Sequence, residues 1–334
     1  MYSLVQKTLL HCDPEWSHDF SLAFLRGSQH NFLRQAYTQD IQSKPVECFG
    51  LTFPNAIGLA AGLDKNAECI DAFAAMGFGF IEVGTVTPKP QAGNDKPRLF
   101  RLPEHQAIIN RMGFNNKGVD YLVEQVKASR FKGILGINIG KNKTTPEENA
   151  LDDYLICLNK VYEHASYITI NISSPNTPGL RNLQFGEALA RLLGGLKDAQ
   201  IKQHQLTGKY VPLLVKIAPD NDELALTQIA EQLLATEMDG VIATNTTLDR
   251  QAVEGHVHAN EMGGLSGAVL CNKSLQVTQT LANVLNGRLP IVGVGGISNV
   301  EDARARLAAG ANLLQVYSSF IYQGPKLIKE LANA

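Results

Sequence analysis

The sequence is poor in cysteine, in metal-binding motifs and in long apolar segments. Its five cysteines are odd in number, lie far apart and form no C-x-x-C pair, which argues against a disulfide framework or a zinc site and predicts reduced thiols in a cytosol-like compartment. They are Cys12, Cys48, Cys69, Cys157 and Cys271. No H-E-x-x-H motif occurs, and the spacing of His256 and His258 is more typical of a solvated loop than of a chelate. We therefore expect no metal site.

Net charge and hydrophobic run length are also small. The chain carries 30 Lys and Arg against 32 Asp and Glu, a net charge of −2, so no strong field attracts nucleic acid and we expect no nucleic-acid partner. The longest run of apolar residues and glycine, 72–81, covers ten positions, too few to cross a bilayer. Residues 1–10 lack the basic start and the cleavage site of a secretory signal. With 44% hydrophobic and 19% charged residues, the composition is that of a soluble globular protein.

From about residue 50 onward, short β-rich apolar runs alternate with longer amphipathic stretches, which is the pattern of repeated βα units. We expect strands at 55–59, 80–84, 134–139, 167–172, 211–217, 240–244, 290–294 and 311–316. We expect helices near 67–76, 117–129, 146–164, 185–204, 222–237, 273–285, 299–309 and 325–333. Eight strands and eight helices in strict alternation predict a (β/α)8 TIM barrel.

The length of 334 residues fits two domains, or one barrel of about 250 residues with an extension. The runner-up fold is a doubly wound open sheet, but GVGGIS (293–298) departs from the dinucleotide fingerprint G-x-G-x-x-G at Ser298. We therefore predict an α/β barrel over residues 46–334 with a small N-terminal helical extension over residues 1–45. Two insertions, 86–116 and 247–272, follow carboxyl ends of strands, on the face where barrel enzymes build active sites.

Many predicted strands end in polar side chains that can bind a ligand. These side chains belong to Lys65, Asn66, Thr85, Asn138, Asn171, Lys216, Thr244, Asn245, Tyr317 and Ser318. Any single Asn or Thr here can be an ordinary turn residue, but in a barrel all of them would face one mouth. Two lysines among several amides predict a site for a planar, anionic, amide-rich molecule.

Lys216 lies inside the apolar run 211–217, where an ammonium is costly unless an anion meets it. Three interpretations stay open: a snorkelling or edge lysine, a group that stabilises negative charge on a ligand, and a nucleophile that forms a Schiff base. Lys65 in GLAAGLDKN (58–66) poses the same question.

Glycine and serine follow the last two predicted strands. GVGGIS (293–298) follows the seventh strand and YSS (317–319) the eighth, where barrels often bind phosphate through backbone N–H groups. Glycine permits close approach of the backbone, although these glycines can also serve only a tight turn. GLSG (264–267) offers a further backbone contact. These segments predict a cofactor with a phosphate tail.

The loop NISSPNTPG (171–179) leaves the fourth strand with two prolines and a glycine, which give it a defined shape and a hinge. No Cys or His lies at a strand end to accept a proton, so Ser174 is the candidate base by elimination, with an ordinary turn serine as the alternative. As a base it would need a dry site, a nearby cation or a water relay.

Seven motifs, in order along the chain, carry a resemblance to a known family. They are GLAAGLDKN (58–66), GTVTPKPQ (84–91), NRMGF (110–114), NIGKN (138–142), NISSPNTPG (171–179), VIATNTT (241–247) and GVGGIS (293–298). Together they resemble the dihydroorotate dehydrogenases over nearly the whole chain. Ser174, where cytosolic relatives carry cysteine, resembles the membrane-associated, quinone-dependent class 2.

The resemblance implies tightly bound, non-covalent FMN over the barrel mouth, with dihydroorotate as substrate and orotate as product. The implied FMN ligands are Ala61, Gly62, Leu63, Asp64, Lys65, Thr85, Asn138, Asn171, Lys216, Thr244, Gly267, Gly296, Tyr317 and Ser318. The implied substrate ligands are Lys65, Asn110, Arg111, Met112, Gly113, Phe114, Asn171, Asn176, Asn245 and Thr246. Ser174 would take the proton from C5 of dihydroorotate while a hydride leaves C6 for FMN, and Lys216 would be the counter-ion of the flavin.

In the extension, Trp16, Phe20 and Phe24 lie on one face of an expected helix that begins at Asp13, and a second short helix is expected near 31–37. From the residues alone, this helix pair packs on the barrel. The four basic and four acidic residues within the first 45 positions indicate no electrostatic membrane anchor.

The resemblance gives the extension a different role. It implies an apolar tunnel that admits a membrane quinone, ubiquinone or menaquinone, with Arg101 and Tyr317 at the quinone head. It also implies peripheral attachment to the cytoplasmic face of a bacterial inner membrane. We expect a monomer or a weak homo-oligomer.

Three other functions stay open on the sequence. An aldolase or another lyase would use Lys216 in a Schiff base and need no flavin. A soluble flavin reductase or oxidase would use NAD(P) or oxygen and would not need residues 1–45. A non-catalytic membrane-surface protein would keep the barrel only as a scaffold, and the many ligand-type side chains at one mouth argue against it.

Overall fold

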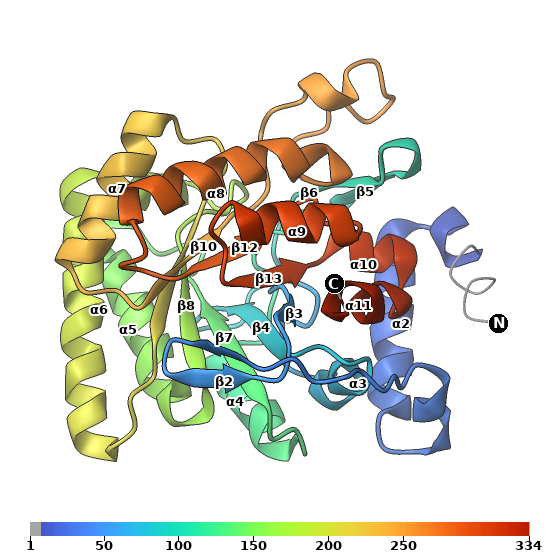
Figure 1. Ribbon diagram of the computed structural model, residues 1–334, viewed down its shortest axis with the longest axis horizontal. Coiled ribbons are helices and arrows are strands. Elements are labelled where there is room, and N and C mark those ends of the chain that lie inside the picture. The colour runs from blue at the N-terminus through green and yellow to red at the C-terminus, as the bar shows by residue number, and fades with distance from the viewer. Residues whose placement is uncertain (1–7, 334) are drawn as a thin grey trace.

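Eight parallel strands close into a barrel, as the alternating pattern predicts (Figure 1). The computed structural model describes residues 8–333. The barrel strands are β3 (Ile57–Leu59), β4 (Phe80–Val86), β7 (Ile134–Ile139), β8 (Tyr167–Asn171), β9 (Leu213–Ile217), β10 (Gly240–Ala243), β12 (Ile291–Val294) and β13 (Leu313–Val316). β13 pairs in parallel with β3, with Leu314 opposite Ile57, and so closes the ring. The predicted (β/α)8 fold is confirmed.

Helices connect the strands and cover the outside of the barrel (Figure 1). They are α3 (Ile70–Ala75), α4 (Val119–Ala128), α5 (Ala150–Val161), α6 (Gly186–Thr207), α7 (Glu223–Ala235), α8 (Cys271–Leu285), α9 (Val300–Ala308) and α11 (Lys326–Ala332). Side-chain caps begin two of them: Asp222 accepts a hydrogen bond from the Ala225 N–H, and Asn299 accepts one from the Asp302 N–H, both at 2.8 Å. A further helix, α10 (Ser318–Gln323), was not predicted, because its first residues directly follow the eighth strand and were assigned to a phosphate-binding segment.

Side chains that alternate along the strands fill the barrel, so its interior is a packed core and no channel. The rings of Phe80 and Tyr167 are the large members of this core, and their centroids lie 6.3 Å apart. Glycine makes room for each ring. A Cβ on Gly58 would lie 2.3 Å from the Phe80 ring, and one on Gly136 would lie 2.2 Å from the Tyr167 ring. A larger apolar layer packs between the strands and the helices. The rim of the barrel is therefore a rigid support for polar side chains.

A β-hairpin that the sequence analysis missed packs on the barrel interior. It consists of β1 (Val46–Cys48) and β2 (Leu51–Phe53). Phe49 and Gly50 form its turn at positive φ. The ring of Phe53 packs edge-on against Phe80, with 5.1 Å between centroids. Strands of three residues are too short to show an alternating pattern, which is why they escaped prediction.

The two insertions form a three-stranded antiparallel sheet, although the sequence analysis assigned no strands to them. Its strands are β5 (Leu99–Leu102), β6 (Ala107–Asn110) and β11 (Gly264–Gly267). β6 lies in the middle, and its residue Asn110 pairs with Leu99 on one side and with Gly264 on the other. The sheet joins segments that are far apart in the sequence, and a local pattern does not show such a pairing.

The N-terminal extension packs beside the barrel (Figure 1). Its elements are α2 (Pro14–Ser28) and the 3-10 turn η1 (Phe32–Ala36). As predicted, Asp13 caps α2: its Oδ1 accepts a hydrogen bond from the Trp16 N–H at 2.8 Å. None of the helices within residues 8–333 is long and apolar enough to cross a membrane.

Candidate active site

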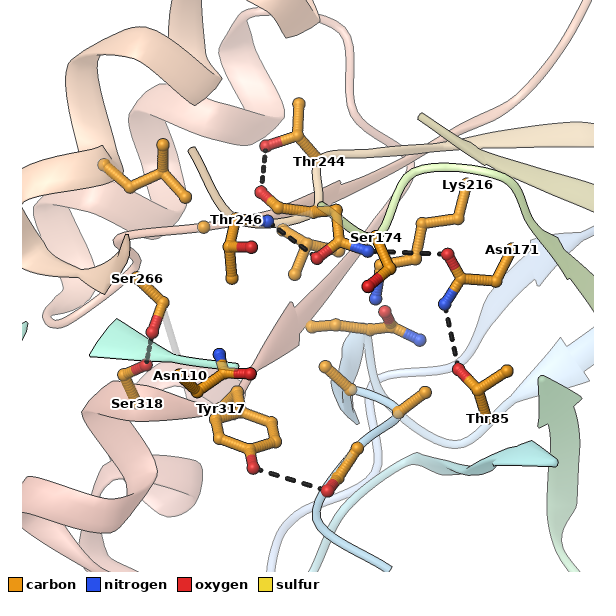
Figure 2. A pocket seen from close by; sticks show the side chains of 18 of the residues that line it. Thr85, Asn110, Asn171, Ser174, Lys216, Thr244, Thr246, Ser266, Tyr317 and Ser318 are labelled. Carbon is orange, nitrogen blue, oxygen red and sulfur yellow. Dashed lines mark hydrogen bonds between the residues drawn. The ribbon is translucent and has the colours of Figure 1, made fainter. Parts of the chain in front are cut away.

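A cavity opens where the barrel strands end, bordered by the sheet of the insertions; we call it the mouth cavity (Figure 2). Most of the predicted site residues line it. They are Ala61, Gly62, Lys65, Thr85, Asn110, Met112, Gly113, Phe114, Asn171, Ser174, Asn176, Lys216, Thr244, Asn245, Thr246, Gly267, Gly296, Tyr317 and Ser318. Side chains from seven strand ends and from both insertions thus meet in one space.

The two ends of the mouth cavity differ in chemistry. Figure 2 shows Ser174, Lys216 and Asn171 at one end and the pair Ser266 and Ser318 at the other. The first end, the amide end, carries ammonium and carboxamide groups. The second end, the glycine end, carries hydroxyl groups and backbone N–H groups.

Three residues of the predicted flavin site lie outside the mouth cavity. Asn138 is fully buried beneath it, and Leu63 faces a neighbouring apolar cavity. Asp64 accepts hydrogen bonds from the N–H groups of Glu68 and Cys69, at 2.9 and 2.8 Å, and so fixes the loop that carries Lys65. Burial raises the pKa of the Asp64 carboxyl to about 6.

The Arg111 side chain, predicted to contact the substrate, points away from the mouth cavity. Its Nη1 lies 2.7 Å from Glu261 Oε2, and its guanidinium carbon lies 4.7 Å from the centre of the Phe100 ring. Glu261 and Phe100 belong to the two insertions. The guanidinium therefore links the two insertions outside the cavity and does not point into it.

A chain of buried hydrogen bonds orients the amides of the amide end. Asn171 Nδ2 donates to Thr85 Oγ1 at 2.9 Å (Figure 2). Thr85 Oγ1 donates to Asn138 Oδ1 at 2.5 Å. Asn138 Nδ2 donates in turn to Glu82 Oε1 at 2.8 Å. Because a carboxamide has one donor end and one acceptor end, the Glu82 carboxylate fixes Asn138 with its oxygen toward Thr85.

Glu82 was missed by the sequence analysis, although it is an acidic residue within an apolar strand. It is completely buried in β4 and accepts further hydrogen bonds from the Tyr167 hydroxyl at 3.0 Å and from Gln315 Nε2 at 2.7 Å. Three donors thus satisfy a carboxylate that would otherwise be costly to bury.

Lys216 lies in β9, in register with Asn171 on β8 and Ile242 on β10. The residue is only 5% exposed and lines the mouth cavity. Burial lowers the pKa of its ammonium, while the Glu82 carboxylate acts in the opposite direction. Lys216 forms no ion pair with any residue between positions 8 and 333. The ammonium is therefore suited to meet negative charge on a ligand.

Lys65 is the second lysine of the mouth cavity. Burial and the nearby Arg98 lower its pKa to about 8, against the opposing effect of Asp19 and Glu15. Lys65 is therefore a cation at neutral pH and loses its charge in mildly alkaline solution.

Ser174 is buried at the start of the loop 171–179. Its Oγ accepts a hydrogen bond from the Asn176 N–H at 3.2 Å, and within residues 8–333 no carboxylate or histidine is hydrogen-bonded to it. A developing negative charge on this oxygen would therefore depend on the two lysines of the same cavity, Lys65 and Lys216.

Arg181, also missed, connects two segments behind the amide end. Its Nε donates to the Ser173 carbonyl at 2.9 Å, and its Nη2 donates to the Thr246 carbonyl at 2.8 Å. The Asp220 carboxylate holds the guanidinium through Nη1 at 2.8 Å. Arg181 thus ties the Ser174 loop to the segment after β10.

At the glycine end, the backbone itself forms the wall. Gly267 has φ of +107° and Gly296 has φ of +74°. A Cβ would lie 2.2 Å from the Gln106 carbonyl oxygen at the first position and 2.3 Å from the Cys271 nitrogen at the second, so both require glycine. Within the described residues, the N–H groups of Gly295 and Gly296 donate to no protein acceptor. Such N–H groups form a suitable site for a phosphate.

A second, apolar cavity of about 660 Å³ lies between the extension and the barrel. Side chains of α2 and η1 line it, together with Leu63, Phe73 and Ile108. Arg101, the predicted quinone residue, lines it too and donates from Nη1 to the Leu9 carbonyl at 2.9 Å. Tyr317 lines both cavities and is the wall that they share.

His18 is a polar residue of the apolar cavity that the sequence analysis did not single out. Burial and the charges of Lys65, Arg101 and Arg98 lower its pKa to about 3. His18 is therefore neutral at physiological pH, and its imidazole retains one donor and one acceptor nitrogen.

The comparisons with known proteins agree with this geometry. The family model described as dihydroorotate dehydrogenase matches residues 44–334. The dihydroorotate dehydrogenase (quinone) of Pseudoalteromonas atlantica is 65% identical over the whole of both chains, and that of Saccharophagus degradans is 57% identical over all of this chain and 98% of its own.

Solved structures agree as well. The structure of a DHODH from Eimeria tenella in complex with ferulenol superposes with a TM-score of 0.91 at 38% identity. The match covers 98% of this chain and 93% of that one. On its sequence and its structure, the chain therefore belongs to the dihydroorotate dehydrogenase family.

Proposed function

We propose that this protein oxidises (S)-dihydroorotate to orotate, with FMN as the hydride acceptor and a membrane quinone as the final electron acceptor. This reaction is a step of pyrimidine biosynthesis. The observation that carries the proposal is the shared wall of the two cavities. Tyr317 separates a polar cavity that suits a flavin and a small anion from an apolar cavity that suits a quinone.

The residues present fit FMN. The unpaired N–H groups and the glycine-only turns at the glycine end suit its phosphate, with Gly267, Gly296 and Ser318 as ligands. When bound, FMN accepts a hydride from the substrate and passes the electrons on to the quinone. Lys216, unpaired and buried, would stabilise negative charge at the amide end.

Carboxamides at the amide end suit a cyclic imide. Asn110, Asn171, Asn176 and Asn245 line the cavity, and a carboxamide carries both kinds of group that can pair with imide N–H and C=O groups. Thr246 adds a buried hydroxyl oxygen without a partner in the described chain. A ligand that satisfied these groups would be favoured over analogues that leave them unpaired. Lys65 supplies a cation for the substrate carboxylate.

Ser174 would accept the proton from C5 of dihydroorotate at its Oγ while its own hydroxyl proton leaves through a water relay. The Asn176 N–H already donates to this oxygen, and Lys65 and Lys216 place positive charge in the same cavity. Both features favour negative charge on the serine oxygen. Arg181 keeps Ser173, the neighbour of the base, in place.

The extension would take the quinone, ubiquinone or menaquinone, from a membrane surface. Trp16, Phe20, Phe24, Phe32 and Leu33 are exposed large apolar side chains of the extension, at 41–78% of their surface. Exposed aromatic side chains of this kind favour the membrane interface. They support residues 1–45 as a segment that attaches the protein peripherally to a membrane. We place this attachment at the cytoplasmic face of a bacterial inner membrane and expect a monomer or weak homo-oligomer.

Steady-state orotate formation tests this function. Dihydroorotate is supplied with short-chain ubiquinone, short-chain menaquinone, NAD or oxygen as the sole acceptor. We expect turnover with a quinone and little with NAD or oxygen. Turnover with NAD that matches turnover with either quinone would refute the quinone assignment.

A further inference from the structure

Arg306 is the largest of the fully buried side chains and lies outside the predicted site. It projects from α9 and donates from Nη1 to Ser274 Oγ at 2.8 Å and from Nη2 to the Gly295 carbonyl at 2.9 Å. A further hydrogen bond from Nη2 reaches the Cys271 carbonyl at 3.1 Å, and the buried Nε has no acceptor within the described residues. The guanidinium therefore lies directly behind the glycine end of the mouth cavity.

No carboxylate neutralises this charge by direct contact within the part of the chain that the structure describes. The acidic group that faces it, Asp302, lies one turn earlier on α9 and accepts hydrogen bonds from the N–H and the hydroxyl of Ser298. The Cys271 thiol also faces Arg306, but burial raises its pKa and keeps it neutral. Arginine itself stays protonated in proteins. A buried cation without an ion pair is costly unless an anion binds nearby.

The hydrogen bonds of Arg306 also orient the peptide groups of the turn. In a trans peptide the carbonyl and the following N–H point in opposite directions. Because the Gly295 carbonyl faces the guanidinium, the Gly296 N–H is directed to the opposite side, away from Arg306. Both glycines line the mouth cavity, and their N–H groups donate to no described residue. One side chain thus supplies positive charge and fixes the donors in front of it.

We propose that Arg306 is a positioning residue for the cofactor phosphate: it holds the Gly295–Gly296 turn with its N–H groups toward the cavity and supplies a positive charge that stabilises a phosphate dianion bound there. This role rests on the proposed binding of FMN. Arg306 does not touch the ligand, because the turn lies between them.

Flavin dissociation from the full-length protein tests the proposal. We expect Arg306→Gln to weaken FMN binding on the order of 100-fold or more, the factor that a unit charge exerts on a dianion about 10 Å away at an effective dielectric constant near 20. Riboflavin lacks the phosphate, so its affinity should stay the same. Arg306→Lys keeps the charge and should restore most of the FMN affinity.

The matched control is Arg304→Gln on the same helix. Arg304 is exposed, so this variant changes the net charge equally but leaves the turn intact, and it should bind FMN like the wild type. Equal losses of FMN and riboflavin affinity in Arg306→Gln would show a merely structural role and overturn the proposal. So would wild-type FMN affinity in that variant.

Phosphorus NMR of the wild-type holoenzyme tests the same idea without any variant. The phosphate of free FMN gains a proton near pH 6. We expect the bound phosphate to stay dianionic down to about pH 5, and titration near pH 6 would contradict the proposal. A protein that binds no FMN refutes the proposed function itself, whereas a holoenzyme that oxidises dihydroorotate but fails these tests refutes only the role of Arg306.

Discussion

Replacing Glu82 by Gln tests whether the amide end depends on a buried carboxylate. Glu82 accepts hydrogen bonds from Asn138, Tyr167 and Gln315. A glutamine keeps one oxygen and presents an NH2 group, so at least one of these donors would face another donor. Hydrogen bonds to a charged group contribute about 1.5–3 kcal/mol each, and an unsatisfied buried donor costs about 1–3 kcal/mol. We therefore expect the free energy of unfolding to fall by about 2–4 kcal/mol.

The loss is measurable as a change in melting temperature. At about 2.1 cal/mol/K per residue, 334 residues have an unfolding entropy of about 0.7 kcal/mol/K, so the expected change is a decrease of about 3–6 °C. Asn138 can turn its side-chain oxygen toward the new NH2 group only by giving up the hydrogen bond that this oxygen accepts from Thr85. Because Thr85 lines the mouth cavity, FMN dissociation should also become faster.

The control for Glu82→Gln is Thr169→Val in β8, two strands away from β4 in the barrel. Thr169 is fully buried and its hydroxyl has no partner in the described chain, so this isosteric change should be close to neutral. Calorimetry at one scan rate compares the melting temperatures of the two variants, and flavin fluorescence after dilution compares their rates of FMN release. If Glu82→Gln melts and retains flavin like Thr169→Val, the carboxylate does not organise the site.

Three further predictions concern the mouth cavity. Ser174→Ala should abolish most turnover and keep FMN bound, and near-normal turnover in a steady-state assay would remove Ser174 as the base. Lys216→Ala should lose flavin as well as activity, and borohydride should trap no substrate on Lys216 of the wild type; mass spectrometry that finds such an adduct would favour the Schiff-base enzyme. Lys65 has a pKa near 8 and must be charged to bind the substrate carboxylate, so kcat/KM for dihydroorotate should fall as the pH rises above about 8, and a flat profile to pH 9 would contradict this role.

The barrel was predictable because each of its strands is a separate apolar run that the sequence shows locally. The mouth cavity followed from the same pattern, since the carboxyl ends of parallel strands meet at one rim. Lys216 and Asn171, 45 positions apart in the sequence, are neighbours in register on β9 and β8 for this reason.

Residues that orient the cavity lining without lining the cavity themselves could not be predicted in the same way. Arg181 and Arg306 are single charged residues in ordinary sequence surroundings, and their partners come from other segments. Glu82 does stand out as an acidic residue within an apolar strand, but its partners come from other strands, so the sequence does not show what it orients. The sheet β11-β6-β5 likewise depends on pairing between distant insertions. The Arg111 side chain is held outside the cavity by Glu261, which belongs to the other insertion and lies 150 positions away in the sequence.

An anaerobic absorption spectrum of the purified protein tests the central claim, that dihydroorotate reduces a flavin in the mouth cavity and a quinone reoxidises it. We expect flavin bands that bleach when dihydroorotate is added and return with a short-chain ubiquinone but not with NAD. A colourless protein that does not take up FMN, or flavin bands that dihydroorotate leaves unchanged, would contradict the account and return Lys216 to the Schiff-base interpretation.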